Sequence, residues 1–444
     1  MTGSIRRESL PATLSGSLRE YRVIEGDDIL KRIETFYQWQ NERTREGYWP
    51  YSRMLDEGPR QSCGVVDDLG RRTVGVNLGS QDYLALANHP TIRAAAHEAI
   101  ERYGVHSAGS PAFIGNTRAS ASLEKEISEF LGMERTVLFP TGFAAGFGVI
   151  KGLVRSSDHI VMDALAHACL QEGAAAATKN VFLYRHNDLG SARRWLERIR
   201  ASDKTNGILL ITEGLFSMNS DTPDLNAFAE LARECGATLM VDVAHDFGAL
   251  GEDGRGQLAI QGALDKVDLV MGSFSKTFAS NGGFVAVRSR AAQQYLRYYA
   301  AAGTFSNGLS PIQAAVALTA LRIVRSQEGA ERRRAMMHNS VFLRERLSAA
   351  GMEVYGEPSA IVAVKMGTEA LARLVSREIA GMGLVANLVE FPAVPKGEAR
   401  FRLQVMADHS EQELALAAEI MAKAVRQAKD RLEAIYAQEQ RAVA

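Results

Sequence analysis

Short apolar runs that alternate with amphipathic helical segments are the feature that most limits the fold of this chain. The runs begin near Val74 and are rich in β-branched residues, and helical patterns such as those at 191–200 and 225–235 separate them. The clearest runs are TVLF (136–139), HIVM (159–162), GILLIT (207–212), TLMVDV (238–243), DLVMGS (268–273) and FVAV (284–287). Short strands separated by helices predict an α/β fold with a mostly parallel sheet.

The pattern changes after Pro311. A long helical region extends to about Ala350, and short strands alternate with a helix near 369–382 before a final helix. This order predicts a smaller C-terminal α+β domain behind the large α/β domain. The predicted segments are an N-terminal arm at 1–75, a large domain at 76–310 and a C-terminal domain at 311–444.

Composition narrows the class of protein. A chain of 444 residues is long enough for more than one core, and its formal net charge of −1 gives no broad positive field for nucleic acid. The cysteines form no C-x-x-C pair, so we expect neither a zinc site nor disulfides, and we expect a cytoplasmic protein. No uncharged apolar stretch reaches about 18 residues, so we expect no signal peptide and no membrane span.

Polar and small residues follow several of the predicted strands. They are Thr141, Gly142 and Phe143 after the first run, His167 after the second, Asp242 at the end of the fourth with His245 after it, and Ser273 at the end of the fifth with Lys276 after it. Ligands of an open parallel sheet bind beyond the carboxyl ends of its strands. We therefore expect these residues to meet around one small molecule.

The set matches the needs of pyridoxal 5′-phosphate (PLP). This cofactor requires a lysine for a Schiff base, an acid against the pyridine nitrogen, a cradle for the phosphate and a group stacked on the ring. Lys276 is the candidate lysine, and Asp242 would keep the ring nitrogen protonated. His167 would stack on the ring, and His245 would reach the phenolic oxygen.

The phosphate cradle is expected at residues 141–143. Thr141, Gly142 and Phe143 open a helix-like run of small residues, and backbone N–H groups at a helix N-terminus stabilise an anion. Ser273 would add a hydroxyl. A single aspartate or lysine after a strand is usually structural or solvated, so the prediction depends on the ordered set.

Other catalytic motifs fit the chain less well. Residues 273–276 also match the S-x-x-K motif of penicillin-recognising enzymes, but the S-D-N and K-T-G motifs that accompany it do not occur. The glycines at 251–256 have the wrong spacing for a dinucleotide site, and neither H-E-x-x-H nor a Walker A motif occurs.

With these residues in hand, the chain resembles the α-oxoamine synthase family, which includes serine palmitoyltransferase and consists of fold type I PLP enzymes. The resemblance covers about four-fifths of the chain. Its main markers are NLGSQDYLALANHP (77–90), DALAHA (163–168), EGLFSMNSD (213–221), VDVAHDFGALGEDGRG (241–256), GSFSKTFASNGGFVA (272–286) and TFSNGLSP (304–311).

The resemblance implies specific roles and an assembly. Lys276 would hold PLP, Asp242 would contact the pyridine nitrogen, and His245 would contact the phenolic oxygen. His167 would stack on the ring, and Arg402 would bind the substrate carboxylate. The phosphate would be bound by Gly142, Phe143, Ser273 and a neighbouring subunit's Ser306. Family members are dimers with the active site at the subunit interface. A homodimer is therefore implied.

The reaction that the resemblance implies is a decarboxylative condensation. A small α-amino acid, namely serine, glycine or alanine, would react with an acyl thioester of CoA or of an acyl-carrier protein and give an α-amino ketone. The alternatives are an aminotransferase or a lyase on the same fold. A non-catalytic subunit is disfavoured by the presence of Lys276.

The chain departs from the family pattern at several positions. Val243 replaces the glutamate of the usual D-E-A-H motif. The residues from Ala166 to Cys169 stand in place of the usual N-H-A-S motif. Pro111 and Ser120 stand where arginine and histidine are common. The cofactor residues are intact while the substrate-side segment differs, so we transfer the reaction class and not a specific acyl donor.

Overall fold

The computed structural model describes residues 10–443, which divide into two units. The central unit comprises Gln81–Ala335. The terminal unit combines the chain up to Ser80 with the chain from Met336 onward. Each unit contains a seven-stranded sheet of its own.

The sheet of the central unit is mostly parallel. Its order is β4-β10-β9-β8-β7-β5-β6, and only β10 runs antiparallel to its neighbours. The strands are β4 (Arg135–Phe139), β5 (His159–Asp163), β6 (Val181–Tyr184), β7 (Ile208–Glu213), β8 (Thr238–Asp242), β9 (Leu269–Ser273) and β10 (Gly283–Val287). The predicted α/β fold with a mostly parallel sheet is confirmed. Sequence reasoning missed β6, a short edge strand with only one buried residue.

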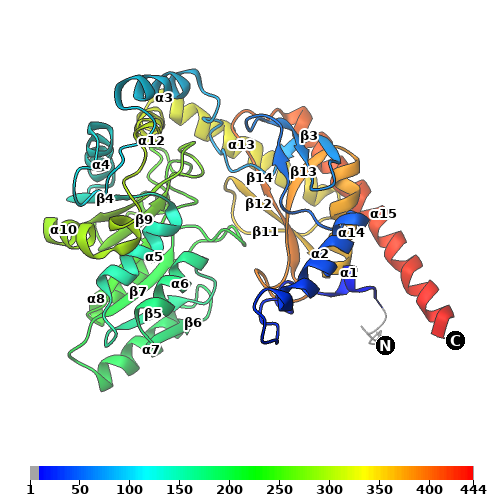
Figure 1. Cartoon of the computed structure of the whole chain (residues 1–444), viewed down its shortest axis with the longest axis horizontal. Helices are drawn as coiled ribbons and strands as arrows, with labels where there is room; N and C mark the ends of the chain where they lie inside the picture. Colours follow the sequence, from blue (N-terminus) through cyan, green and yellow to red (C-terminus); the bar gives the residue numbers. More distant parts are fainter. Residues whose placement is uncertain (1–9, 444) are drawn as a thin grey trace. The chain divides into compact units, whose positions relative to one another are not determined.

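Helices surround this sheet (Figure 1). They are α3 (Pro90–Tyr103), α4 (Arg118–Leu131), α5 (Gly142–Leu153), α6 (Ala168–Ala177), α7 (Leu189–Ser202), α8 (Leu225–Glu234), α9 (Gln257–Ile260), α10 (Arg290–Tyr299), α11 (Ala301–Thr304) and α12 (Pro311–Val324). Apolar side chains of α5, α6 and α10 pack with alternate strand residues in one continuous core. The predicted helices at 191–200 and 225–235 correspond to α7 and α8.

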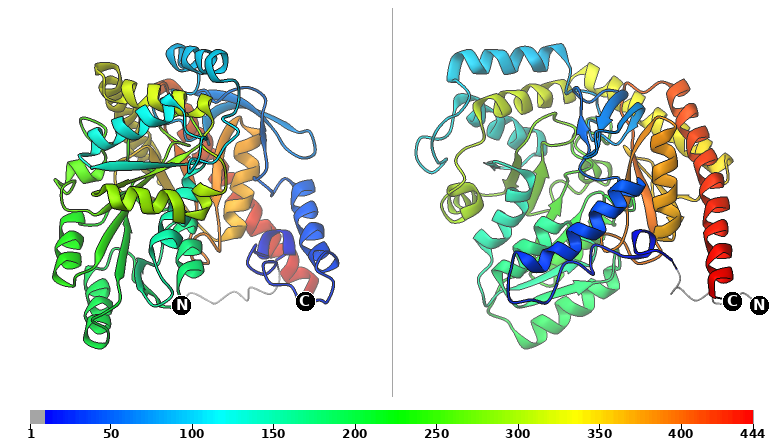
Figure 2. Two further views of the ribbon diagram at one scale, coloured as in Figure 1. Left: turned by 60° about the vertical axis from the view of Figure 1, so that its left-hand side comes forward. Right: turned by 45° about the vertical axis from the view of Figure 1, so that its right-hand side comes forward.

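The terminal unit has a mixed sheet of order β1-β2-β3-β13-β14-β12-β11. Its strands are β1 (Met54–Leu55), β2 (Ser62–Val66), β3 (Arg72–Leu78), β11 (Val354–Tyr355), β12 (Ile361–Gly367), β13 (Leu384–Val389) and β14 (Ala399–Gln404). Its helices are α1 (Ala12–Ser15), η2 (Lys31–Ile33), α2 (Glu34–Glu46), α14 (Glu369–Gly381) and α15 (Glu411–Val443), and α13 (Gln327–Ala349) crosses the division between the units. The long helix α15 packs along α14 (Figure 2).

The boundaries of the two units differ from the boundaries of the predicted segments. Residues 54–78 form strands of the C-terminal sheet, because β3 pairs in parallel with β13. Helix α12 packs against α3 and α4, so it stays with the central unit. Such pairings join distant parts of the chain, and local periodicity does not reveal them. Residues 1–9 of the predicted arm lie outside the described residues.

Between residues 10 and 443, we find no helix that combines the length and the apolar character needed to cross a membrane.

Candidate active site

A cavity of about 250 Å³ lies in the central unit, beyond the ends of β8 and β9 and next to the first turn of α5. Most of the predicted site residues line it. They are Thr141, Gly142, Phe143, His167, Asp242, His245, Ser273 and Lys276. Lys276 itself is half-buried and follows β9 by three residues. The expectation that these residues meet around one cavity agrees with this geometry.

Asp242 is a buried carboxyl group at the end of β8. Its Oδ1 accepts a hydrogen bond of 2.9 Å from the backbone N–H of Ala244. Burial raises the pKa of Asp242, and the nearby His167 opposes this effect. A cation held against the carboxylate would favour its ionised form. The position therefore suits the protonated nitrogen of a pyridine ring.

Glu213 is a second buried acid in the cavity wall, and sequence reasoning missed it. It ends β7 directly beside Asp242 in the parallel register, and its Oε1 accepts a 2.6 Å hydrogen bond from the backbone N–H of His167. Burial and the Asp242 charge raise the pKa of Glu213 well above its usual value. Two adjacent buried carboxylates disfavour each other's ionised form. The position of Glu213 at the end of a strand was the feature of the sequence that could have identified it.

The first turn of α5 faces the same cavity. Thr141 caps the helix, since its Oγ1 accepts a 3.0 Å hydrogen bond from the N–H of Ala144. A Cβ atom at Gly142 would lie 2.4 Å from the Ser273 Oγ, so any side chain there would fill this space. Ser273 in turn lies 2.7 Å from the Ser275 Oγ. The N-terminal turn of a helix, hydroxyl groups and a required glycine suit a bound phosphate.

His167 caps helix α6 and has a defined orientation. Its Nδ1 accepts a 3.3 Å hydrogen bond from the N–H of Cys169 and lies 3.0 Å from the Cys169 thiol. Because Nδ1 is an acceptor, the neutral ring carries its proton on Nε2. Burial raises the pKa of the Cys169 thiol, so it remains protonated. Cys169 is a further cavity residue that sequence reasoning did not assign.

His245 is positioned by a residue far away in the sequence. Its Nδ1 lies 2.9 Å from the hydroxyl of Tyr83, and both side chains are buried. Tyr83 belongs to the 77–90 segment, which carries a family marker but received no role from sequence reasoning. The contact orients the His245 ring.

Two predicted residues lie elsewhere. Ser306 is exposed in the segment after α11. Arg402 belongs to β14 of the terminal unit, where it is half-buried and pairs in register with Ala363 and Asn387.

A charge network joins the end of β5 to the loops that follow β6 and β7. His186 bridges two carboxylates, with Nδ1 3.0 Å from Asp163 and Nε2 2.8 Å from Asp221. Burial lowers the pKa of His186, but its hydrogen bonds to the two acids outweigh that effect and raise the pKa to about 9. The imidazolium therefore ties the end of β5 to these two loops at neutral pH.

The stabilising effect of His186 is expected to fall at alkaline pH. A histidine whose pKa rises from 6.5 to about 9 on folding stabilises the protein fully below pH 6.5, and the effect is lost as the pH rises through about 9. At about pH 6, His186→Gln should lower the free energy of unfolding by up to about 3 kcal/mol. Urea unfolding at a series of pH values measures this difference, and a difference that is independent of pH would contradict the charged bridge.

Comparison with known proteins supplies the family. The model of the family described as aminotransferase class I and II matches residues 73–421. The chain belongs to this family. Within it, the chain belongs to the α-oxoamine synthase group, as the following relatives establish.

Two curated relatives and one solved structure illustrate the match. The chain is 37% identical to 8-amino-7-oxononanoate synthase of Geobacter metallireducens, over 82% of this chain and 91% of the relative. It is 33% identical to serine palmitoyltransferase of Sphingobacterium spiritivorum, over 86% and 94%. A structure of serine palmitoyltransferase with PLP matches with a TM-score of 0.84 and 26% identity, over 90% and 99%.

The cofactor of this α-oxoamine synthase group member is PLP. The residues of the cavity fit it. The buried Asp242 would face the ring nitrogen, the α5 terminus with Ser273 would hold the phosphate, and Lys276 would bind the aldehyde carbon. Bound there, PLP supplies an electron sink for negative charge that develops on the substrate.

Proposed function

We propose that this enzyme condenses serine, glycine or alanine with an acyl thioester and releases carbon dioxide and a free thiol. The observation that carries the proposal is the arrangement of Lys276, Asp242, His167 and the α5 terminus around one cavity. The three free cysteines support a reducing compartment, so we place the enzyme in the cytoplasm.

The bond changes in the substrates define the chemical role of the residues. Among the described residues that line the cavity, Lys276 is the only lysine, and its amine takes the proton from the amino acid Cα. The Cα electron pair then forms a bond to the thioester carbonyl carbon, and the C–S bond breaks. The carboxylate carbon leaves as CO₂, and its bonding electrons return to Cα, where a proton is added. The product is an α-amino ketone.

His167 and Arg402 are the proposed contacts of the substrate carboxylate. With Nδ1 engaged by Cys169, the Nε2–H of His167 is the donor that it presents to a ligand. Arg402 alternates with Phe401 and Leu403, which are buried on the other face of β14. A guanidinium grips a carboxylate with two parallel hydrogen bonds, which lysine does not reproduce.

A homodimer is part of the proposal. Phe113, Ile114 and Phe305 are exposed by 85%, 85% and 84%, and a hydrogen bond between Gly308 and Gly109 joins the two segments that carry them. Large exposed apolar side chains that cluster in this way mark an interface. Ser306 is adjacent to Phe305 and would enter the partner's phosphate site. Sedimentation should give a dimer mass, and Phe113→Asp should shift it toward the monomer.

A spectroscopic titration tests the substrate class. The holoenzyme is mixed with each of the twenty amino acids, and the cofactor absorbance reports which of them binds. The responding amino acid is then assayed with acyl thioesters of graded length for release of thiol and CO₂. Arg402→Lys should weaken amino-acid binding and leave cofactor content unchanged. Amino-group transfer without thiol release would contradict the proposed reaction.

Replacing Asp242 by Asn is expected to leave the cofactor bound and to lower turnover by about 10²-fold or more. The amide has the size of the carboxyl group, but it carries no charge to keep the ring nitrogen protonated. Cofactor absorbance measures occupancy, and kcat measures the loss. Near-normal turnover would contradict the role of Asp242. Asp246→Asn is a control, because this buried acid does not line the cavity.

A further inference from the structure

Tyr83 is a buried residue that contacts the candidate active site through its hydroxyl group. The hydroxyl oxygen lies 2.9 Å from Nδ1 of His245, and the two residues are 0% and 7% exposed. The ring centroids are 6.4 Å apart at an interplanar angle of 40°, so the two rings do not stack. His245 lines the cavity, whereas Tyr83 is not among the described residues of its wall. An effect of Tyr83 on a bound cofactor therefore passes through the imidazole.

The orientation of the His245 ring is not set by its backbone. The backbone just before it is held at the end of β8, where the N–H of Ala244 donates a 2.9 Å hydrogen bond to Asp242. The imidazole can still rotate about its Cβ–Cγ bond, a torsion with two broad preferred positions. Half a turn would present a C–H group to the Tyr83 hydroxyl in place of Nδ1. The hydrogen bond between two buried groups would then be lost, so this contact disfavours the rotated ring.

The same hydrogen bond influences which ring nitrogen carries the proton. When the Tyr83 O–H donates to Nδ1, the neutral imidazole has its proton on Nε2 and offers an N–H donor there. When Nδ1–H donates to the Tyr83 oxygen instead, Nε2 is an acceptor. The phenolic oxygen of PLP carries negative charge when it is ionised, and it then requires a donor. The first arrangement is therefore the one that suits a cofactor contact of His245.

Tyr83 is itself held in a tightly bonded turn. Both carboxylate oxygens of Asp82 accept hydrogen bonds from backbone N–H groups four and five residues later, at 2.8 and 2.9 Å. The backbone carbonyl of Leu84 accepts a 3.1 Å hydrogen bond from Arg332. The side chain of Leu84 is 0% exposed. The hydroxyl of Tyr83 is therefore carried by a fixed segment, as a group that orients another side chain requires.

We propose that Tyr83 is a positioning residue that acts on the cofactor through His245. Its hydroxyl holds the His245 ring in the orientation and the tautomer that donate a hydrogen bond from Nε2 to the phenolic oxygen of PLP. The inference rests on the proposed function and on the predicted contact of His245 with that oxygen. A hydrogen bond to the ionised form of an oxygen favours that form. Loss of the Tyr83 hydroxyl therefore raises the share of PLP that is protonated on this oxygen.

The absorbance spectrum of the holoenzyme tests the inference, because the protonated and ionised forms of bound PLP absorb at different wavelengths. Tyr83→Phe removes one oxygen atom and keeps the ring in its packing. At a fixed pH and without substrate, the ratio of protonated to ionised PLP should rise by about tenfold, the effect of one weakened hydrogen bond to a charged acceptor. Tyr184→Phe is the matched control. Tyr184 is also 0% exposed, and its hydroxyl donates a 3.0 Å hydrogen bond to the carbonyl of Ile211, away from the cavity wall. This variant should keep the wild-type spectrum.

A double variant shows whether the effect passes through His245. His245→Ala should change the spectrum in the same direction as Tyr83→Phe, and Tyr83→Phe should then add nothing in the His245→Ala background. Circular dichroism verifies that each variant is folded. A wild-type spectrum in Tyr83→Phe or in His245→Ala, an equal change in Tyr184→Phe, or additive effects in the double variant would overturn the inference. These spectra involve no substrate, so a failure to release thiol would contradict the proposed reaction and leave the role of Tyr83 supported.

Discussion

The Lys276→Ala enzyme is expected to lose essentially all turnover while it remains folded. The substitution removes the amine that takes the Cα proton, a role worth up to about 10⁴-fold, and it also removes the covalent attachment of the cofactor. We therefore expect kcat to fall by about 10⁴-fold or more. Steady-state assay of thiol release measures the effect, and circular dichroism measures the fold. The side chain is only half-buried, so little packing is lost.

Chemical trapping provides the matching positive test. Borohydride reduction of the wild-type holoenzyme should leave the cofactor on a peptide that contains Lys276. Lys151→Ala serves as the control, because that lysine is exposed on α5 and lies outside the cavity wall. An adduct on any other lysine, or turnover near normal in Lys276→Ala, would show that the assignment is wrong.

Replacing Glu390 by Ala is expected to destabilise the terminal unit by about 3–5 kcal/mol. Glu390 joins two buried arginines, with Oε1 3.1 Å from Arg43 and Oε2 2.8 Å from Arg373. The side chains of the arginines are 0% exposed, and that of Glu390 is 1% exposed. Removal of the carboxylate leaves two buried cations without their counter-ion, in a region where the desolvation cost is no longer offset.

Tryptophan fluorescence during urea unfolding measures this loss. Trp39 and Trp49 both lie against Arg43, and the third tryptophan, Trp195, belongs to the central unit. In a Trp195→Phe background, the signal therefore reports the terminal unit alone. Asp56→Ala removes an exposed ion pair and should cost no more than about 1 kcal/mol. An equal, small cost for Glu390→Ala would contradict a structural role for the triad.

The same triad explains why the N-terminal segment belongs with the C-terminal part of the chain. Arg373 donates hydrogen bonds to the backbone carbonyls of Thr13 and Gly16, and Arg43 donates one to that of Tyr48. In a sequence, charged residues such as these arginines normally predict a solvated surface. Only the folded chain reveals that Arg43 shares one buried carboxylate with Arg373 in the interior, so the sequence suggested a separate arm.

The α/β architecture and most of the candidate site could be predicted from the sequence. Buried parallel strands are continuous apolar runs, and functional side chains follow them directly, so Asp242 and Lys276 were recognisable from local pattern alone. The folded structure then added Glu213, Cys169 and Tyr83, whose importance depends on neighbours in space. Glu213 becomes significant because it lies beside Asp242, and Tyr83 because it contacts His245.

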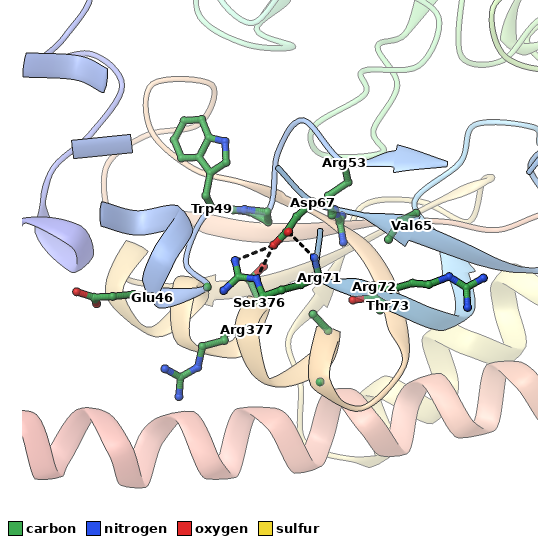
Figure 3. A pocket seen from close by; sticks show the side chains of 14 residues that line it. Glu46, Trp49, Arg53, Val65, Asp67, Arg71, Arg72, Thr73, Ser376 and Arg377 are labelled. Carbon is green, nitrogen blue, oxygen red and sulfur yellow. Dashed lines mark hydrogen bonds and ion pairs between the residues drawn. The ribbon is translucent and has the colours of Figure 1, made fainter. Parts of the chain in front are cut away.

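The long-range pairings were decided by the tertiary structure alone. Strand β3 pairs with β13 across about 300 residues of sequence, and the sequence pattern did not predict β13 at all. Arg53 and Trp49 likewise line a pocket together with residues of α14 (Figure 3). Periodicity reports whether a segment has a buried face, and it therefore determined the helices, the parallel strands and the order of the site residues. It carries no information about which distant segment covers that face, because pairing depends on contacts that form only when the whole chain folds.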